Sequence, residues 1–536
     1  MENGNGLLDS GSASSSGESQ QAPLDRYVDG HWVSDIEANS ANAGNPPTKH
    51  TPGIWTKLVV RPAQAVWKVA YLPNSTAPLR PTAYLDGLRG FAAFLVYIHH
   101  NELWAHAAST EGDNAAFENA WGFEHRRHFA TLPFVRNFFT GGHIAVAIFY
   151  VISGYVLCAK PLSLVMAGEH LKLLDSMASS FFRRWFRLYI PIFATTFIYV
   201  TSWHVFGNYW VSNSDQHATI LEEYWNWYVE LKNFTFLFKE GTIWVTFNTH
   251  LWSIPFEMRG SMMVFILMLV IYRVTTFYRH CIMLGLAFYF IYIVDAYYCC
   301  MFMVGVYLCY LDLLAKRGEL PNWIARKKAH KYKYIIPMYI VGLYLAGVPS
   351  QRNDLDLLRK NPGWYYLSFL KPQAVFDPKW FYLTAAAGLI VGCTQHLPPV
   401  KRFFEGAFCQ YLGHISYSLY LVHGPVISSV GDRVYAMTGW YRKVEDHQKM
   451  LEWWINRFYL PSSGPMGLEF SFLAPQIIIA PVTFILANLV TKYIDEPAVR
   501  FPAWMYKKVC GGDSTPAPSM ASRPEPSRPA DPQRLE

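Results

Sequence analysis

Ten long, mostly apolar stretches constrain this chain more than any other feature of its sequence. They lie near residues 88–105, 142–160, 187–206, 251–272, 280–295, 297–315, 333–349, 380–396, 407–430 and 470–495. A helix of about 20 apolar residues crosses the hydrocarbon core of a bilayer, and the shorter stretches here can cross with tilt or with flanking aromatic residues. The sequence therefore predicts an all-α, polytopic membrane protein with about ten transmembrane helices.

The composition agrees with a membrane protein. Of the 536 residues, 52% are hydrophobic and only 16% are charged, which is too apolar for a water-soluble chain of this length. The net charge of +7 does not indicate a nucleic-acid partner, because the basic residues lie beside the apolar stretches instead of forming one basic stripe. Membrane lipids are the partner that this charge pattern predicts.

The basic residues also predict the orientation. They gather in short loops around residues 160–187, 273–279, 316–333 and 401–402, which all fall on one side of the membrane if the amino terminus is inside. By the positive-inside rule, both termini face the cytosol, in the plasma membrane or an endomembrane such as the ER. The eight cysteines fall within the apolar stretches or on this side, and none has the spacing of a metal site, so we expect neither disulfides nor a metal.

The two ends of the chain differ from its middle. Residues 1–80 begin with a Ser-, Gly- and Asn-rich segment typical of disorder, and residues 54–72 mix aromatic and basic positions. That mixture is typical of an interfacial helix and equally of a linker packed on the core. Residues 506–536 are a Pro- and Ser-rich cytosolic tail. The predicted membrane domain is therefore 81–505.

The first apolar stretch carries two polar residues whose spacing places them on the same face of a helix. Arg89 and His100 are eleven residues apart, which places them on one face of a helix and about 16 Å apart along its axis. Arg89 would then lie at a membrane surface and His100 near the middle of the bilayer. An intramembrane imidazole indicates a functional site, although a histidine that only bonds to a neighbouring helix is the alternative.

This arrangement resembles the Arg-(ten residues)-His signature of the acyltransferase 3 family, and the chain resembles the fungal branch of that family. Four further motifs extend the resemblance over residues 84–504: Gly142 to Tyr155 ending in Ser-Gly-Tyr, Arg184-Trp-Phe-Arg187-Leu-Tyr-Ile-Pro191, Trp252-Ser-Ile-Pro-Phe-Glu257, and Ser416-Tyr-Ser-Leu-Tyr-Leu-Val-His423. The resemblance implies a membrane O-acyltransferase that uses an acyl-CoA, with acetyl-CoA as the implied donor. Its acceptor is a hydroxyl of a polysaccharide, a lipid or a small metabolite.

Acyl transfer to a hydroxyl requires a general base and a group that stabilises charge on the carbonyl oxygen. His100 is the predicted base, because imidazole titrates near neutral pH. Arg89 and Glu257 complete the predicted catalytic set. Glu257 is expected to orient or polarise the ring of His100, and its alternative role is to neutralise Arg259. Arg89 has an alternative role as a surface anchor paired with Asp86.

Two further pairs are candidate binding residues. Arg184 and Arg187 share a helix face at the predicted cytosolic mouth of the third span, where they would bind the phosphates of coenzyme A. Positive-inside charge alone is the alternative explanation for them. Ser416 and His423 also share a face and are predicted to line the acceptor cavity, with a structural interhelical hydrogen bond as the alternative.

Other classes of protein remain open at this stage. Buried Arg, His and Glu side chains also form proton and solute paths in transporters, although we find no internal repeat of the kind that transporters contain. The other large class of membrane O-acyltransferases also depends on an intramembrane histidine, but the residues around it would differ from this motif. Near the carboxyl end, Asp495-Glu496-Pro497 is expected to cap the last helix.

Overall fold

The computed structural model describes residues 27–28, 31–32, 79–107, 114–207, 210–211, 216–238, 241, 243–325, 331–350, 353–441 and 450–510. The chain divides into two compact units, 1–46 and 47–536. In the first unit, β1 (Tyr27–Val28) and β2 (His31–Trp32) pair antiparallel with Tyr27 opposite Trp32. The predicted interfacial segment 54–72 and most of the predicted carboxyl-terminal tail lie outside the described residues.

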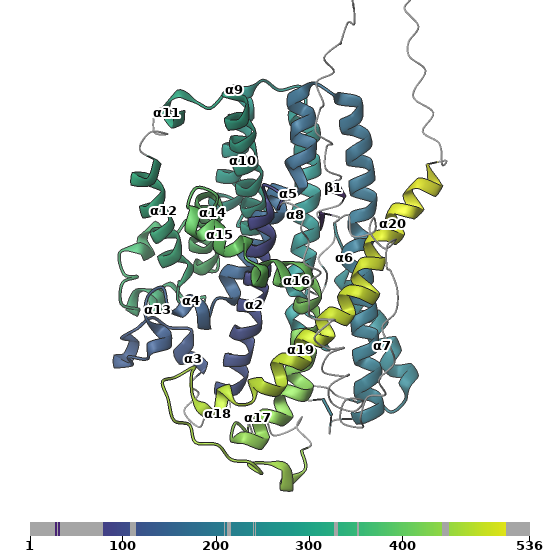
Figure 1. The fold of residues 1–536 in the computed structure, drawn as a ribbon, viewed down its shortest axis with the longest axis vertical. Helices are drawn as coiled ribbons and strands as arrows, with labels where there is room; N and C mark the ends of the chain where they lie inside the picture. The colour runs from purple at the N-terminus through teal and green to yellow at the C-terminus, as the bar shows by residue number, and fades with distance from the viewer. Residues whose placement is uncertain are drawn as a thin grey trace, which may run out of the picture. The chain divides into compact units, whose positions relative to one another are not determined.

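The second unit is helical, and each of the ten predicted stretches overlaps one long helix (Figure 1). These helices are α2 (Ala83–His106), α5 (Gly142–Ala167), α6 (His170–Phe206), α8 (Ser253–Ile271), α9 (Thr276–Tyr292), α10 (Tyr297–Arg317), α12 (Lys331–Ala346), α14 (Pro378–Thr394), α16 (Ala407–Val426) and α19 (Gln476–Val490). Shorter helices join them: α3 (Asn114–Phe117), α4 (Arg136–Phe139), α7 (Ile220–Phe234), α11 (Asn322–Ala325), α13 (Leu355–Lys360), α15 (Pro398–Glu405), α17 (Asp432–Thr438), α18 (Phe470–Leu473) and α20 (Glu496–Val509). The predicted helical architecture is confirmed.

Five segments of the described chain are both long and apolar enough to cross a membrane. They are Gly142–Ala167, His170–Phe206, Thr249–Ile271, Tyr297–Arg317 and Phe470–Val509. The protein is therefore an integral membrane protein, while the count of ten spans and the orientation stay predictions. Helix α2 is not among the five, and its sequence holds Asp86, Arg89, Glu102 and three histidines.

Helix α2 lies unusually close to α16. A Cβ atom on Gly90 would come within 2.1 Å of the backbone nitrogen of Gly413, and one on Gly87 would come within 1.8 Å of the carbonyl oxygen of Phe404, just before α16. Such separations are possible only for glycine, since it has no side chain. The backbones of α2 and α16 therefore touch, and this contact fixes residues on α2 relative to residues on α16.

Helix α6 is longer than its apolar stretch predicts. It begins at His170 and contains 37 residues, which corresponds to about 55 Å of helix, well beyond the hydrocarbon thickness of a bilayer. The polar residues before position 187 continue the helix instead of ending it. Arg184 therefore lies about four turns inside α6 and is buried, while its place at the cytosolic mouth of the third span stays a prediction.

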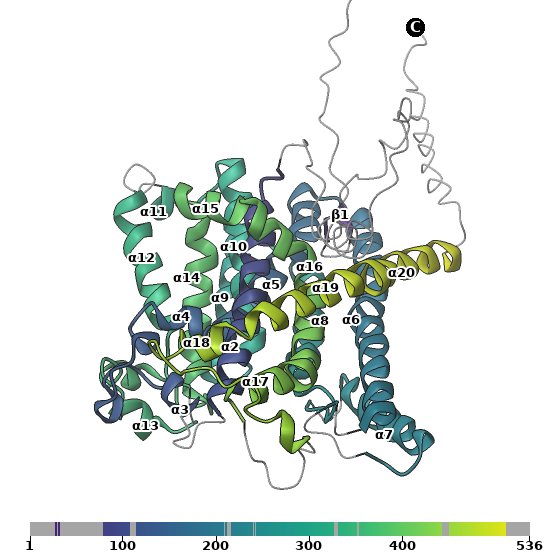
Figure 2. The same ribbon diagram turned by 60° about the horizontal axis from the view of Figure 1, so that its bottom comes forward.

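The last long helix also differs from its prediction. A π-helical turn at Thr491–Asp495 joins α19 to α20, so the helix continues to Val509 and packs on α6 (Figure 2). Asp495 is 4% exposed inside this continuous helix, so the expected cap at Asp495 is wrong. Because a π turn inserts an extra residue, it can redirect side chains without ending the helix. The predicted tail boundary at 506 consequently falls within α20.

Candidate functional site

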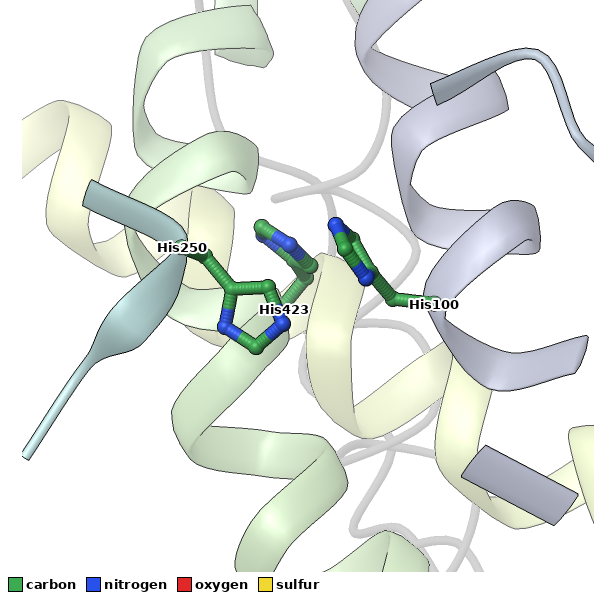
Figure 3. A group of neighbouring side chains, drawn as sticks. All are labelled: His100, His250 and His423. Atoms are coloured by element: carbon green, nitrogen blue, oxygen red, sulfur yellow. The ribbon is translucent and has the colours of Figure 1, made fainter. Parts of the chain in front are cut away.

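Three histidines from distant parts of the sequence meet in the core. We call His100 on α2, His250 in the 3₁₀ turn Thr249–Trp252 before α8, and His423 on α16 the histidine cluster. Their ring centroids are 4.2 Å apart for His100 and His250, 5.3 Å for His100 and His423, and 4.8 Å for His250 and His423. Figure 3 shows the three rings facing one another, each carried by a different segment. One ring nitrogen from each lies within 4.8 Å of the other two.

Hydrogen bonds assign the tautomers of two of these rings. Nδ1 of His423 is 3.2 Å from the carbonyl oxygen of Leu419, and a carbonyl only accepts, so this nitrogen carries the hydrogen. Nδ1 of His250 is 3.3 Å from Oδ1 of Asn248, whose amide nitrogen donates to the carbonyl of Leu421 at 3.2 Å and thereby fixes the orientation of the amide. In their neutral forms, both histidines therefore present an unprotonated Nε2. Nε2 of His423 is buried and has no hydrogen-bond partner among the described residues.

Two more histidines extend the cluster. The ring of His99 is 5.0 Å from that of His100 and 5.3 Å from that of His143. Ring nitrogens of His99 and His143 lie within 4.8 Å of the carboxylate of Glu118, in the segment between α3 and the next turn. Burial raises the pKa of Glu118, and the nearby Lys379 and Arg136 partly offset this effect. A row of imidazoles therefore runs from His100 to a loop carboxyl group.

The predicted arginines form a second region. Arg184 on α6 makes an ion pair with Glu257 on α8, and its Nε donates to the hydroxyl of Ser261 at 2.9 Å. Arg184 is buried and the side chain of Glu257 is only 12% exposed, so each charge supplies the compensation that the other needs away from water. Glu257, predicted to orient His100, is thus bound to Arg184.

Arg89 and Arg187 complete this region, together with a carboxylate that the sequence analysis assigned to a cap. Nη2 of Arg89 donates to the carbonyl of Gly413 at 3.0 Å, and the hydroxyl of Ser416 donates to the same carbonyl at 2.9 Å. The buried carboxylate of Asp495 lies within electrostatic range of both Arg187 and Arg89. We call Arg89, Arg184, Arg187, Glu257 and Asp495 the arginine group.

The histidine cluster and the arginine group lie at different heights along the helix bundle, and both include a residue of α2. Eleven residues of α2 separate Arg89 from His100, or about 16 Å of helix. Seven residues separate Ser416 from His423 on α16, which is about 10 Å. The structure therefore places Ser416 with the arginine group and His423 with the histidine cluster. It brings His100 and His423 together, and it places Glu257 at the other level.

Neither the place of His250 in the site nor the buried position of Asp495 was predicted from the sequence. His250 directly precedes the Leu-Trp-Ser start of the Trp252 to Glu257 motif, and a polar ring at the start of an apolar stretch was the available signal. Asp495 is an acid at the end of the last apolar stretch, and arginines in other stretches had no assigned acidic partner. Together, these two observations could have indicated that Asp495 pairs with an arginine. Neither stretch of sequence indicates which residues of other helices lie opposite His250 or Asp495.

Three converging imidazoles also have the chemistry of a metal site. Zinc accepts three histidine ligands, and metal-bound histidines commonly donate their second ring N–H to a carbonyl, as His423 and His250 do here. His99, His143 and Glu118 form a second set with suitable ligand atoms. The geometry is thus compatible with a metal as well as with proton transfer.

Comparison with known proteins identifies the family. Residues 82–487 match the acyltransferase 3 family, which is described as an acyltransferase domain, and this range covers most of the chain. The chain belongs to the acyltransferase 3 family. The match includes every residue of the histidine cluster and all of the arginine group except Asp495. This membrane protein is therefore an acyltransferase, as the sequence motifs predicted.

Three curated relatives are similar to this acyltransferase along most of their length. O-acetyltransferase PaAT-1 of Phomopsis amygdali is 26% identical over 479 residues, which cover 82% of this chain and 87% of the relative. Acyltransferase R4 of Phoma sp. and acyltransferase clz18 of Cochliobolus lunatus are each 21% identical, covering 80% and 79% of this chain and 97% of each relative. No solved structure matches the chain.

Proposed function

We propose that this acyltransferase transfers an acyl group, acetyl first of all, from a cytosolic acyl-CoA to the hydroxyl of a polysaccharide, a lipid or a small metabolite. The observation that carries the proposal is the convergence of His100, His250 and His423 in the core of a family-matched domain. The relative PaAT-1 is named as an O-acetyltransferase, which supports acetyl as the transferred group and oxygen as the acceptor atom.

The arginine group is the proposed binding site for the nucleotide part of the acyl-CoA donor. Guanidinium groups match the geometry of phosphates, and coenzyme A is a polyanion with a long pantetheine arm. Arg89, Arg184 and Arg187 would bind or attract the nucleotide part, with Glu257 and Asp495 holding their side chains in place. The distance of about 16 Å along α2 then suits an extended donor whose thioester reaches His100.

The histidine cluster is the proposed site of chemistry. His100 takes the proton of the acceptor hydroxyl, and the hydroxyl oxygen attacks the thioester carbonyl carbon. The new C–O bond forms, the C–S bond breaks, and the leaving thiolate of coenzyme A receives the proton from His100. His423 would line the acceptor side, and Ser416 would support Arg89 through the carbonyl that they share.

The proposed setting is a membrane domain of residues 81–505 with about ten spans and both termini in the cytosol, in the plasma membrane or an endomembrane. Residues 1–80 and the tail beyond the last helix are the proposed cytosolic ends. Basic loops on one side support this orientation. A protease-protection assay on sealed vesicles should find both termini accessible from the cytosolic side, and a sheltered terminus would reverse every loop assignment.

A labelled-donor experiment tests the function. Membranes that contain the full-length protein are incubated with carbon-13-labelled acetyl-CoA and a cell extract, and mass spectrometry searches for products that gain the labelled acetyl mass. We expect a labelled ester that is absent with the His100→Ala variant. A folded protein that yields solute flux across vesicles and no labelled ester with any acyl-CoA would instead support a transporter.

A further inference from the structure

A cavity of 740 Å³ lies between α8, α9 and α10. Helix α10 packs on both α8 and α9, whereas α8 and α9 have little contact with each other, so the cavity fills the gap between them. Its walls include Met262 and Met263 of α8 and Ile282 and Leu286 of α9. None of its lining residues belongs to the histidine cluster or the arginine group. The cavity is therefore separate from the proposed active site and large enough for a small ligand.

The cavity opens toward the hydrocarbon of the bilayer. Ile266 and Val270 line it and are 61% and 55% exposed, and the neighbouring Leu284 and Phe288 of α9 are exposed as well. Exposed apolar surface of this kind on a membrane protein contacts lipid chains. Along α8, the lining extends from Arg259 to Val270, which is about 16 Å of helix. One leaflet contributes about 15 Å of hydrocarbon, so the cavity is about as long as one leaflet is deep.

Arg259 places a positive charge at one end of this cavity, and the other lining residues are uncharged. Glu257, two residues earlier on α8, points to the opposite side of the helix and is bound to Arg184. Nε of Arg259 is buried and has no hydrogen-bond partner among the described residues, and none of their carboxylates forms an ion pair with Arg259. A guanidinium without a counter-ion beside hydrocarbon is unfavourable. This end of the cavity is therefore complementary to an anionic group.

The surroundings of Arg259 place its charge near a membrane surface. Arg259 contacts the hydroxyl of Tyr298, and its guanidinium carbon is 5.8 Å from the centre of the Phe256 ring. Tyr298 is the second residue of α10, and Phe290, which also lines the cavity, is two residues before the end of α9. Lipid headgroups lie where the spanning helices end, and tyrosines gather at the same level. An anion bound to Arg259 is therefore at the level of the headgroups.

We propose that this cavity binds a glycerophospholipid of the surrounding bilayer, with its phosphate on Arg259 and one acyl chain between α8 and α9. Guanidinium groups match the geometry of phosphate oxygens, and the apolar walls beyond Arg259 suit the chain. A water-soluble anion would instead have to leave water for a cavity that opens to hydrocarbon. Because α8 carries Glu257 on its other side, the bound lipid stabilises α8 opposite the arginine group. This site does not depend on the proposed acyl transfer.

Thermal melts of the purified full-length protein in detergent test the phosphate contact. Added phosphatidylcholine should raise the melting temperature of the wild type by a few degrees, because a ligand that binds only the folded protein stabilises it. Diacylglycerol with the same two chains lacks the phosphate and should give a smaller rise. Arg259→Met should remove this difference between the two lipids. Arg273→Met is the matched control and should retain the difference, since Arg273 is an exposed arginine just beyond α8 that also lies over a ring.

A variant that fills the cavity tests the place of the acyl chain. A Cβ atom on Gly285 of α9, which lines the cavity, would meet open space. Gly285→Leu therefore puts an apolar side chain where the lipid chain would lie, and it should remain folded because leucine favours a helix more than glycine does. The variant should lose the rise in melting temperature with phosphatidylcholine. Leu284→Phe adds volume at the next residue, outside the cavity, and should retain the rise.

Native mass spectrometry of the same samples identifies the occupant. We expect one phospholipid on the wild type and about 10-fold less on Arg259→Met and on Gly285→Leu, as the loss of a contact to a charged group or of the space for the chain predicts. Equal retention of phospholipid by the wild type and both variants would overturn the site. Equal stabilisation by diacylglycerol and phosphatidylcholine would overturn the phosphate contact. A free fatty acid such as oleate bound in place of a phospholipid would overturn the proposed occupant.

Discussion

The arginine group and the histidine cluster lie at different heights in the helix bundle, and they differ in how their charges are compensated. In the arginine group, each buried cation has a carboxylate nearby, as with Arg184 and Glu257. In the histidine cluster, the ionisable groups of the described residues that face His100 are all histidines. Pairing with carboxylates holds the arginine side chains in place for the proposed polyanionic donor, whereas neutral rings with free lone pairs suit the proposed proton transfer.

A second histidine on α2 sharpens this contrast. His106 lies six residues beyond His100, and its ring nitrogens are 3.4 Å from Oε2 of Glu102 and 3.2 Å from Oε1 of Glu469. All three side chains are buried. Among the described residues, acids therefore surround His106, whereas the ionisable groups that face His100 are histidines.

The largest effect that we expect is on acyl transfer, and it distinguishes His100 from His106. His100→Ala should reduce acyl transfer about 10² to 10⁴-fold, the usual contribution of a positioned base, while membrane insertion and CoA binding persist. His106→Ala should instead lower the melting temperature, because it leaves two buried carboxylates without their partner. Transfer assays and thermal melts of both variants make the comparison, and near-normal transfer by His100→Ala would refute its role as the base.

The next effect concerns the stability of the arginine group. Arg184→Met leaves Glu257 buried without its cation and should lower the free energy of unfolding by about 3–5 kcal/mol. The double variant Arg184→Met with Glu257→Leu removes both charges and should recover most of that loss. Unfolding in detergent measures both variants. If the double variant is no more stable than the single one, the ion pair is not what stabilises this region.

A smaller effect is expected on donor binding. Arg187→Ala should weaken acyl-CoA binding about 10 to 100-fold, which is the usual consequence of losing a hydrogen bond to a charged group in a partly desolvated site. Arg500→Ala, at an exposed arginine on α20, is the matched control for the loss of one positive charge. Competition binding with labelled CoA measures the affinity. Unchanged affinity in both Arg184→Ala and Arg187→Ala would assign these residues to lipid contact or topology.

The smallest expected effect concerns Ser416. Its hydroxyl bonds to the carbonyl of Gly413 on its own helix, at the level of the arginine group. Ser416→Ala should therefore lower stability by about 0.5–1.5 kcal/mol and change transfer only slightly. A large loss of acceptor affinity in this variant, measured as a raised KM for the acceptor, would show that Ser416 contacts the acceptor and would extend the acceptor site toward the arginine group.

Features that lie within a single helix could be predicted from the sequence, whereas contacts between residues of two different helices could not. The spacing of Arg89 and His100 followed from helical periodicity, and the helices followed from the apolar stretches. The pairing of Glu257 with Arg184 could not be predicted, because packing determines how far α8 is shifted along its axis relative to the neighbouring helices. That offset brings His250 to the level of His100 and leaves Glu257 about 10 Å beyond it.

The glycine contact between α2 and α16 has a consequence for engineering this enzyme. Since Gly90 and Gly413 allow no side chain between them, the distance from His100 to His423 tolerates little variation in a mutant library. His250 arrives on a separate segment, before α8, that does not take part in that contact. Attempts to broaden the range of accepted alcohols should therefore diversify residues 243–247 and the loops beside them, and keep Asn248 and the two glycine-packed helices as they are.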